Sequence, residues 1–210
     1  MQVPKSLRNP EVLAARLSEI DAPHVYGLNA FVRQLRDVKG NRYSIPYFDP
    51  HDGGSEGEIL FLLEAPGPRA KETGIVSRDN PDETAKNILE LNFLANLDRK
   101  RTIQWNIVPW FIGKTEGSKE TIRAATVKDI NEGMETLMEV ISLLPRLKTV
   151  VLVGNKAAKA AGFLLAKRRE LHISTMPHPS PVFINRARDK NRSRILEALN
   201  RVSQGTRSDA

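Results

Sequence analysis

Cysteine is absent from the 210-residue chain. The protein therefore forms no disulfide bond and offers no thiolate ligand to a zinc ion or an iron–sulfur cluster. Long apolar runs are also missing. No stretch approaches the roughly 20 residues of a membrane-spanning helix, and the N-terminal stretch MQVPKSLRNPEVLAARL has no apolar signal core. These absences predict a soluble cytoplasmic protein that does not bind a membrane, and no metal or cofactor is expected.

Glycine-rich phosphate loops are a further absence. Neither GxGxxG nor GxxxxGK[ST] occurs, although these patterns form the phosphate cradles of the common nucleotide-binding α/β proteins. A nucleotide-binding α/β protein is therefore the weakest of the functions that we consider. No internal repeat or low-complexity segment is present, and the length is that of a single domain.

Positive charge is in moderate excess. Lysine and arginine outnumber aspartate and glutamate by 32 to 25, which gives a formal net charge of +7. Residues 181–210 alone contain seven basic residues against three acidic ones. Such a local excess favours a polyanionic partner. The alternative is an ordinary solvated helix face, which is what charge runs usually form.

Four short stretches rich in β-branched or aliphatic residues predict buried strands, and helical patterns alternate with them. Strands that alternate with helices form a parallel sheet covered on both faces. The predicted fold class is therefore α/β, a three-layer αβα arrangement with a central, mainly parallel sheet of four strands. The predicted strands are Glu58–Leu63, Ile103–Val108, Thr149–Val153 and Leu171–Met176.

Capping residues and prolines mark the helices. Asn80 and Pro81 are typical of an N-cap and a first helical position, so a helix is predicted from there to about Leu97. Asn80 as a second catalytic amide is the less favoured alternative. The other predicted helices are Pro10–Ile20, Asn29–Asp37, Val127–Leu144, Lys156–Ala166 and Arg188–Val202.

These elements predict one monomeric domain over residues 1–202. Residues 1–57 supply the N-terminal helices and a surface loop at Pro46–Gly57, and residues 58–202 supply the α/β core. Residues 203–210 are predicted to be a flexible tail.

Polar side chains coincide with stiff backbone where the predicted strands end. Glu64 opens a Pro/Gly-rich loop after the first strand, Asn106 lies near the end of the second, and His178 is enclosed by prolines after the fourth. In parallel sheets, binding sites form where loops leave the carboxyl ends of the strands. We therefore expect these side chains to line one preorganised pocket.

Four motifs in this order resemble the uracil-DNA glycosylase superfamily. The likeness runs from about Glu58 to Val202, and it is closest to the branch whose first motif reads Gly-Glu-Ala-Pro-Gly and whose usual members hold an iron–sulfur cluster with four cysteines. The motifs are LLEAPGPRAKETG at 62–74, WNIVPW at 105–110, VVLVGNKAA at 150–158 and HPSP at 178–181.

The resemblance implies a monofunctional DNA repair enzyme that hydrolyses the N-glycosidic bond of uracil, or of a related deaminated base, and leaves an abasic site. Breaking that bond builds positive charge on the sugar and negative charge on the base. Glu64 matches the acid that orients water and stabilises the cationic sugar. His178 matches the histidine that donates a hydrogen bond to the departing base. The alternatives are a capping or ion-paired glutamate and a turn histidine.

The resemblance also assigns substrate contacts. Asn106 matches the asparagine that reads the Watson–Crick edge of the flipped base, since its amide offers one donor and one acceptor. The alternative is an amide that only satisfies the sheet edge. The other implied substrate-binding residues are Ala65, Pro66, Gly67 and Ser180.

The segment after HPS implies a DNA-binding surface. An apolar wedge fills the space that a flipped base leaves, and basic residues hold the phosphates. The implied wedge is Val182 with Phe183, and the implied DNA-binding cations are Arg186, Arg188 and Arg192. The expected partner is uracil-containing or abasic DNA in the nucleoid.

Three positions depart from the family pattern. Trp110 stands where the iron–sulfur branch has a cysteine, so packing must replace the cluster. Ser77 stands near the place of the aromatic that stacks on uracil, and Phe61, Trp110 or Phe111 are the expected substitutes. The stretch 111–123 lacks the histidine of a covalent-capture relative. The missing aromatic supports the alternative function, a catalytically weak module that binds lesions or abasic sites.

Overall fold

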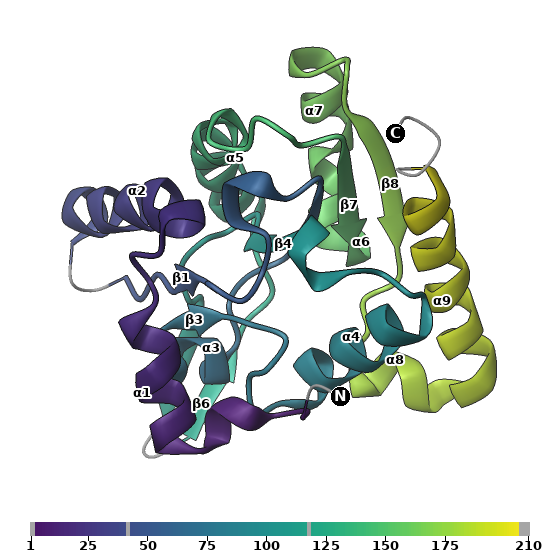
Figure 1. Cartoon of the computed structure of the whole chain (residues 1–210), viewed down its shortest axis with the longest axis horizontal. Helices are drawn as coiled ribbons and strands as arrows, with labels where there is room; N and C mark the ends of the chain where they lie inside the picture. Colours follow the sequence, from purple (N-terminus) through teal and green to yellow (C-terminus); the bar gives the residue numbers. More distant parts are fainter. Residues whose placement is uncertain (1–2, 41–42, 117–118, 206–210) are drawn as a thin grey trace.

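The computed structural model describes residues 3–40, 43–116 and 119–205. Its central sheet has four strands in the order β4-β2-β7-β8, and every neighbouring pair is parallel (Figure 1). All four predicted strands are confirmed, each within two residues at either end. The strands are β2 (Ile59–Leu63), β4 (Thr102–Asn106), β7 (Thr149–Val153) and β8 (His172–Met176).

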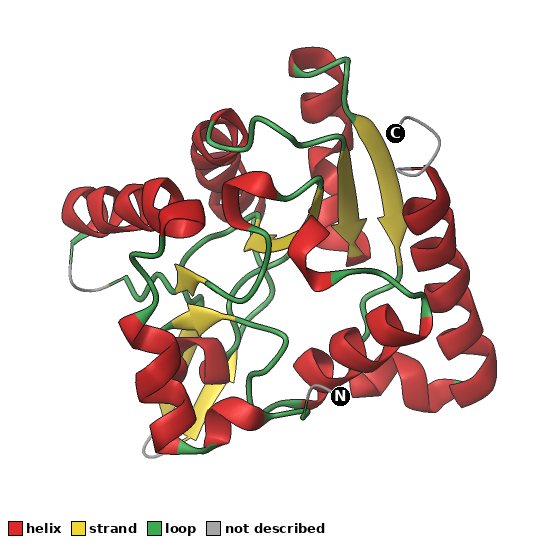
Figure 2. Ribbon diagram, viewed as in Figure 1, coloured by secondary structure: helices red, strands yellow, loops and turns green. Residues whose placement is uncertain are grey.

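Side chains that alternate along the strands divide the core into two layers. Leu60, Leu62 and Trp105 join an apolar cluster with the helices of one face. Phe61 and Val151 join a second cluster with the helices of the other face. The three-layer αβα prediction is therefore confirmed (Figure 2). The first face is covered by α2 (Pro23–Lys39), α5 (Val127–Ser142) and α7 (Ala161–Lys167), and the second by α4 (Glu83–Leu94) and α9 (Arg188–Gly205).

Several smaller elements complete the fold, and among them the predicted helix Pro10–Ile20 is confirmed as α1. Two elements that were not predicted shape the surroundings of the sheet edge: a short helix that follows HPS, and an antiparallel hairpin between β4 and α5. No helix in the described ranges is long and apolar enough to cross a membrane. The smaller elements are α1 (Pro10–Ser18), α3 (Pro68–Thr73), α6 (Gly154–Ala157), α8 (Pro181–Arg186), β1 (Tyr47–Phe48), β3 (Ile75–Val76), β5 (Gly113–Glu116) and β6 (Lys119–Ile122).

The prediction that Pro46–Gly57 is a surface loop is wrong. Phe48, Asp49 and Asp52 are each at most 2% exposed. The two aspartates are buried because arginines from distant parts of the chain pair with them. A buried acid is tolerated when it is paired and hydrogen-bonded.

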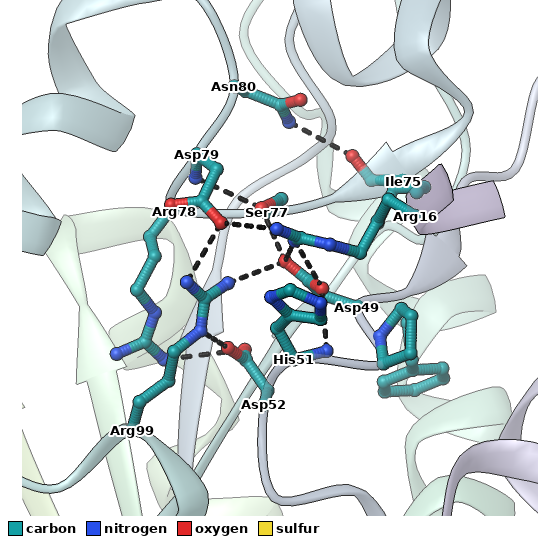
Figure 3. Close-up of polar contacts among 12 residues, drawn as sticks. Arg16, Asp49, His51, Asp52, Ile75, Ser77, Arg78, Asp79, Asn80 and Arg99 are labelled. Carbon is teal, nitrogen blue, oxygen red and sulfur yellow. Dashed lines mark hydrogen bonds and ion pairs between the residues drawn. The ribbon is translucent and has the colours of Figure 1, made fainter. Parts of the chain in front are cut away.

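The partners form one buried ion network (Figure 3). Arg99 bridges three acids, with its Nη2 2.7 Å from Asp49, its Nε 2.8 Å from Asp52 and its Nη1 2.8 Å from Asp79. Arg16 on α1 binds the same Asp49 and Asp79 at 2.8 and 3.0 Å. The network therefore ties α1, the loop after β1, the loop after β3 and the start of β4 together.

Within the network, the pKa values of the two aspartates Asp49 and Asp52 are shifted in opposite directions. Burial alone raises the pKa of Asp49, but Arg99 and Arg16 outweigh it and the pKa is lowered overall. Burial dominates at Asp52 and raises its pKa despite Arg78 and Arg99. Burial opposes the charge of Arg99, yet Asp52, Asp49 and Asp79 raise its pKa. Two cations face each carboxylate, but Asp49 also accepts hydrogen bonds from Ser77 and the backbone of His51, whereas the Asp49 charge raises the pKa of Asp52.

The predicted N-cap at Asn80 is wrong. Asp82 caps α4, because its side chain accepts the backbone N–H of Ala85. The Asn80 side chain is buried instead, where it donates to the carbonyl oxygen of Ile75 at 2.9 Å and accepts from the hydroxyl of Thr73 at 2.8 Å. Aspartate and asparagine are equally good N-caps, so the tertiary contacts of Asn80 decide between them.

Three other boundaries differ from the predictions. The second helix begins at Pro23 rather than Asn29, since proline suits the first helical turn. The predicted helix Lys156–Ala166 is broken into α6, a 3₁₀ turn and α7. The last helix, α9, continues to Gly205 and buries Ser203, and the rest of the expected tail, 206–210, lies outside the described residues.

Candidate active site

A cavity of about 440 Å³ opens at the carboxyl ends of β2 and β4, and we call it the sheet-edge cavity. Glu64 follows β2 directly, Asn106 is the last residue of β4, and His178 comes two residues after β8. All three line the cavity, as the sequence predicted for one pocket. The predicted substrate-binding residues Ala65, Pro66 and Gly67 also line it.

Asn106 places an unpaired amide in this cavity. The residue is 3% exposed, and its Nδ2 has no hydrogen-bond partner among the described residues. Its backbone is paired with Leu63 in the parallel ladder, which fixes the side chain on the wall. A buried donor without a partner costs about 1–3 kcal/mol unless a ligand satisfies it. The alternative of an amide that satisfies the sheet edge does not account for this unpaired nitrogen.

Glu64 connects the sheet to the chain after the β5–β6 hairpin. Its Oε1 accepts the backbone N–H of Ala125 at 2.7 Å, and Lys156 donates to the carbonyl oxygen of Ala125 at 2.7 Å. The hairpin end thereby contributes Ile122 and Arg123 to the cavity wall. Glu64 forms no ion pair within the described residues. One oxygen is thus engaged with backbone, while the carboxylate charge stays at the cavity.

Four residues on its own and adjoining elements restrict the position of His178. Prolines at 177 and 179 restrict its backbone. Asn87 on α4 donates to the carbonyl oxygen of Pro179 at 2.9 Å. Gly154 at the end of β7 has φ +82°, and a Cβ there would lie 3.1 Å from the Cβ of His178. Sequence reasoning missed Asn87 because its partner is 92 residues away.

Burial lowers the pKa of His178, and the nearby Glu64 carboxylate opposes this shift only in part. The imidazole is therefore neutral near pH 7, and a neutral ring carries one N–H donor. Asp82, which caps α4 and lines the same cavity, has its pKa raised by burial.

The predicted DNA-binding residues do not line the cavity, and neither does Ser180, the remaining predicted substrate-binding residue. Ser180 instead caps α8 by accepting the N–H of Phe183 at 3.2 Å. Val182 on α8 is 66% exposed, whereas Phe183 is half-buried against the second apolar cluster. Arg186 and Arg188 are exposed at the α8–α9 junction.

Arg192 is placed differently from the other predicted cations. It turns toward α4, where its Nη1 lies 3.6 Å from a Glu90 carboxylate oxygen. Figure 1 shows α4, α8 and α9 close together on this side of the molecule.

No aromatic side chain in the described ranges lines the sheet-edge cavity, and Ser77 does. The expected substitutes are wrong. Phe61 and Trp110 are core residues, each 2% exposed, and Trp110 packs edge-on against Tyr43 with ring centroids 5.5 Å apart. Phe111 does not line the cavity either. The apolar part of the lining is aliphatic, with Leu63, Val76 and Ile88.

Several cavity residues were not predicted. Gln104 lies two residues before Asn106 on β4, so the period-two rule puts both on one face of the strand. The alternation of polar residues along this strand could have predicted that Gln104 lines the cavity together with Asn106. The contribution of the hairpin had no such signal. Asn80, the less favoured second catalytic amide, lines the cavity as well. The unpredicted lining residues include Asp82, Thr84, Ile88, Gln104, Ile122 and Arg123.

No group of three or more histidine, aspartate or glutamate side chains in the described part of the chain is arranged to hold a metal ion. Three of the groups that line the cavity come from separate strand ends: the acid Glu64, the amide Asn106 and the neutral imidazole of His178. Together they can stabilise a positive centre, match a hydrogen-bonding edge and donate to a developing anion.

Fold and cavity define an α/β protein with its site at the carboxyl edge of a parallel sheet. A sequence profile described as "Uracil DNA glycosylase superfamily" matches residues 50–202. The chain belongs to the uracil DNA glycosylase superfamily. No curated protein matches it by sequence.

Solved structures are similar to this chain at low identity. SMUG2 of Pedobacter heparinus is 14% identical, and the match covers 72% of this chain and 76% of that one with a TM-score of 0.58. A putative uracil DNA glycosylase of Methanosarcina acetivorans is 15% identical over 69% of this chain and 90% of that one, with a TM-score of 0.45. The likeness to SMUG2 is one of fold, and the catalytic assignment has to come from the site.

Proposed function

We propose that the protein is a monofunctional DNA glycosylase that removes uracil, or a related deaminated base, by hydrolysis and leaves an abasic site. The observation that carries this proposal is the unpaired, buried Nδ2 of Asn106 in the same cavity as Glu64 and His178. An amide in that position matches the O4 acceptor and N3–H donor of uracil, whereas cytosine presents the reverse pattern.

In the proposed mechanism, Glu64 and His178 act on opposite ends of the breaking bond. The Glu64 carboxylate orients the attacking water and stabilises the cationic sugar. The neutral His178 donates its N–H to the base oxygen on which negative charge develops. The aimed histidine needs no reorganisation, because Gly154, Asn87 and the flanking prolines already fix it.

DNA binding is assigned to the surface next to the cavity mouth. Val182 is the apolar wedge, since it is exposed and follows His178 by four residues. Arg186 and Arg188 supply phosphate contacts. The backbone at Gly67, which lines the cavity, and the hydroxyl of Ser180 are assigned to the nucleotide that carries the lesion. Phe183 supports the wedge from the apolar cluster beneath it.

One observation favours a second function. The cavity has no stacking aromatic in its described lining, and base–aromatic stacking is worth about 1–3 kcal/mol. A protein without it fits a catalytically weak module that binds lesions or abasic sites. Such a module keeps the wedge and the cations but gains little from a flipped base.

Excision and binding measured side by side separate the two functions. The wild-type protein is incubated with oligonucleotides that carry uracil, hypoxanthine, xanthine or normal bases, and abasic product is quantified in single turnover. Affinity for abasic DNA is measured in parallel. We expect release of at least one deaminated base and none from normal DNA. Tight abasic-site binding without any excision would establish the binding module instead.

A further inference from the structure

A second cavity of about 840 Å³ lies at the far end of α4 from the sheet-edge cavity, and we call it the α4-end cavity. The first turn of α4 lines the sheet-edge cavity, while the last turn of α4, the following loop and Arg192 on α9 line this one. Its lining residues are Pro4, Arg78, Leu89, Glu90, Asn92, Phe93, Leu94, Asn96, Leu97, Asp98, Arg99, Arg101 and Arg192.

Two buried donors in its wall lack partners. Arg78 is 1% exposed, and its Nε has no hydrogen-bond partner in the described chain. Its Nη2 is engaged with Asp52 and Thr102 at 3.3 and 2.6 Å (Figure 3 shows Arg78 beside Asp52). Asn92 is 3% exposed, and its Nδ2 is likewise without a partner among these residues. Two orphaned donors in one wall are unusual, since buried polar groups are normally satisfied.

The acceptors at the same end of α4 are already used. The carbonyl oxygens of Leu91 and Phe93 accept the backbone N–H of Ala95 or Asn96, and that of Asn92 accepts the N–H of Leu97 at 3.0 Å. The buried side-chain atoms of this wall that lack a partner among the described residues, Arg78 Nε and Asn92 Nδ2, are both donors. They call for a ligand that brings acceptors and no further donors.

The rest of the cavity is apolar. Phe93 and Leu94 are 66% and 57% exposed at its rim, and Leu89 and Leu97 are buried in its lining. Exposed large apolar groups next to a concave surface usually mark a binding site. A ligand that fills this cavity thus needs an apolar body as well as its acceptor group.

The orphaned donors select the acceptor group. Net charge does not, because every arginine in the lining is paired with an acid. The pairs are Arg78 with Asp52, Arg99 with Asp49, Arg101 with Glu58 and Arg192 with Glu90. A carboxylate is an acceptor-only group with two oxygens. It suits two orphaned donors better than an amide, which adds donors of its own.

We propose that the α4-end cavity binds a small carboxylate with an apolar body, its oxygens on Arg78 Nε and Asn92 Nδ2 and its body over Phe93 and Leu94. The site is separate from the glycosylase site. Ser77 and Asn80 line the sheet-edge cavity, and Arg78 between them lines the other, so the two cavities lie on opposite sides of one segment.

Octanoate is the probe for the test, with octanamide and octylammonium as neutral and cationic counterparts. The ¹H–¹⁵N resonances of Arg78 Nε–H and Asn92 Nδ2–H₂ are followed by NMR while each probe is added to the full chain. We expect octanoate to shift both resonances in a saturable way. Octanamide binds about five- to tenfold more weakly, because one favourable charged contact is lost. Octylammonium gives no saturable shift.

Variants check the location. Asn92→Leu should weaken octanoate binding about five- to tenfold by removing one donor. Leu94→Ser, at an exposed position that does not threaten the fold, should weaken it as well. Asn131→Leu on the exposed face of α5 and His178→Ala in the sheet-edge cavity should leave octanoate affinity unchanged. Absence of saturable shifts, equal binding of octanamide, or full affinity in both Asn92→Leu and Leu94→Ser would overturn the proposal.

Discussion

Glu64 Oε1 accepts a 2.7 Å hydrogen bond from the backbone N–H of Ala125, which lies 61 residues further along the chain. This bond closes the β5–β6 hairpin segment against the end of β2. The proposed catalytic acid therefore has a structural task in addition to its chemical one. A single variant at this position cannot separate the two, but a pair of variants can.

Glu64→Gln keeps an oxygen that can accept from Ala125 but removes the negative charge. We expect single-turnover excision to slow by at least about tenfold, because the cationic sugar loses its carboxylate. DNA affinity should stay equal or rise slightly, since a negative charge leaves a phosphate-binding surface. Excision kinetics with a parallel binding curve measure both.

Glu64→Ala is the matched comparison, since it removes the charge and the hydrogen bond. It should lose the same catalysis and also about 1 kcal/mol of stability, which lowers the melting temperature by roughly 2–4 °C in a chain of this size. An unchanged excision rate in Glu64→Gln would show that the Glu64 carboxylate has no catalytic role.

Asn106→Asp tests the amide that faces the cavity without a partner. The variant replaces a donor by a carboxylate oxygen that faces the O4 acceptor of uracil. We expect uracil excision to fall by about 10- to 100-fold, in line with the cost of a lost matched contact, while affinity for undamaged DNA is retained. Rates and affinities are compared with those of Asn131→Asp, an exposed change on α5. Equal uracil excision by the two variants would contradict the assignment.

The sequence predicts the sheet and the three cavity side chains for a local reason. Apolar runs such as Thr149–Val153 are short, rich in β-branched residues and followed by a glycine, and these features do not depend on distant residues. Glu64, Asn106 and His178 then fall at strand ends, where parallel topology brings them together.

The structural features that the sequence does not predict depend on contacts between residues far apart in the chain. Asp49 is buried because Arg16 and Arg99 pair with it, and these arginines lie 33 and 50 residues away in the sequence. A Pro/Gly-rich stretch with acids resembles a surface loop when such distant partners are not known. The choice of Asp82 over Asn80 as N-cap depends on Thr73 and Ile75 in the same way. The residues that line the sheet-edge cavity come from several distant segments, so the absence of a stacking ring from its described lining also depends on the tertiary structure.

Gly154→Ala tests the support behind His178. The residue has φ +82°, where a Cβ is strained, and the added Cβ would press on His178 at 3.1 Å. We expect a loss of about 1–2 kcal/mol in stability and a fall in excision rate as the imidazole is displaced. Chemical denaturation and single-turnover assays measure the two effects.

Gly162→Ala on α7 is the control for that change. Nothing lies within 4 Å of its added Cβ, and the position is helical, so stability should rise by about 0.4–1 kcal/mol with excision unchanged. Wild-type activity in Gly154→Ala would mean that His178 needs no such support.

Val182→Ala tests the wedge. The residue is 66% exposed, so its truncation should change the melting temperature little. Excision from double-stranded DNA should fall more than excision from single strands, because only a duplex has to be unstacked around the flipped base. Val127→Ala, an exposed valine at the start of α5, should affect neither substrate. Equal losses on paired and single-stranded DNA would argue against a wedge.

His178 makes the stability of the protein depend on pH in a direction that can be worked out. Burial lowers its folded-state pKa below the ordinary value of 6.5, so the unfolded chain binds more protons as the pH falls through 6.5. The free energy of unfolding therefore decreases as the pH falls through that value and continues to decrease down to the folded-state pKa. His178→Asn, which keeps a donor but does not titrate, lacks this contribution.

We expect the wild type to lose more stability than His178→Asn between about pH 7.5 and pH 5. Denaturant titrations of both proteins at each pH measure the difference, and every other titrating group cancels in the comparison. An NMR titration of the His178 ring gives the folded-state pKa directly. His178→Ala should also lower the excision rate by about 10²- to 10³-fold, the usual cost of removing one preorganised oxyanion donor. Parallel stability curves for wild type and His178→Asn would show that the imidazole is not desolvated, and the neutral-donor role would then have to be abandoned.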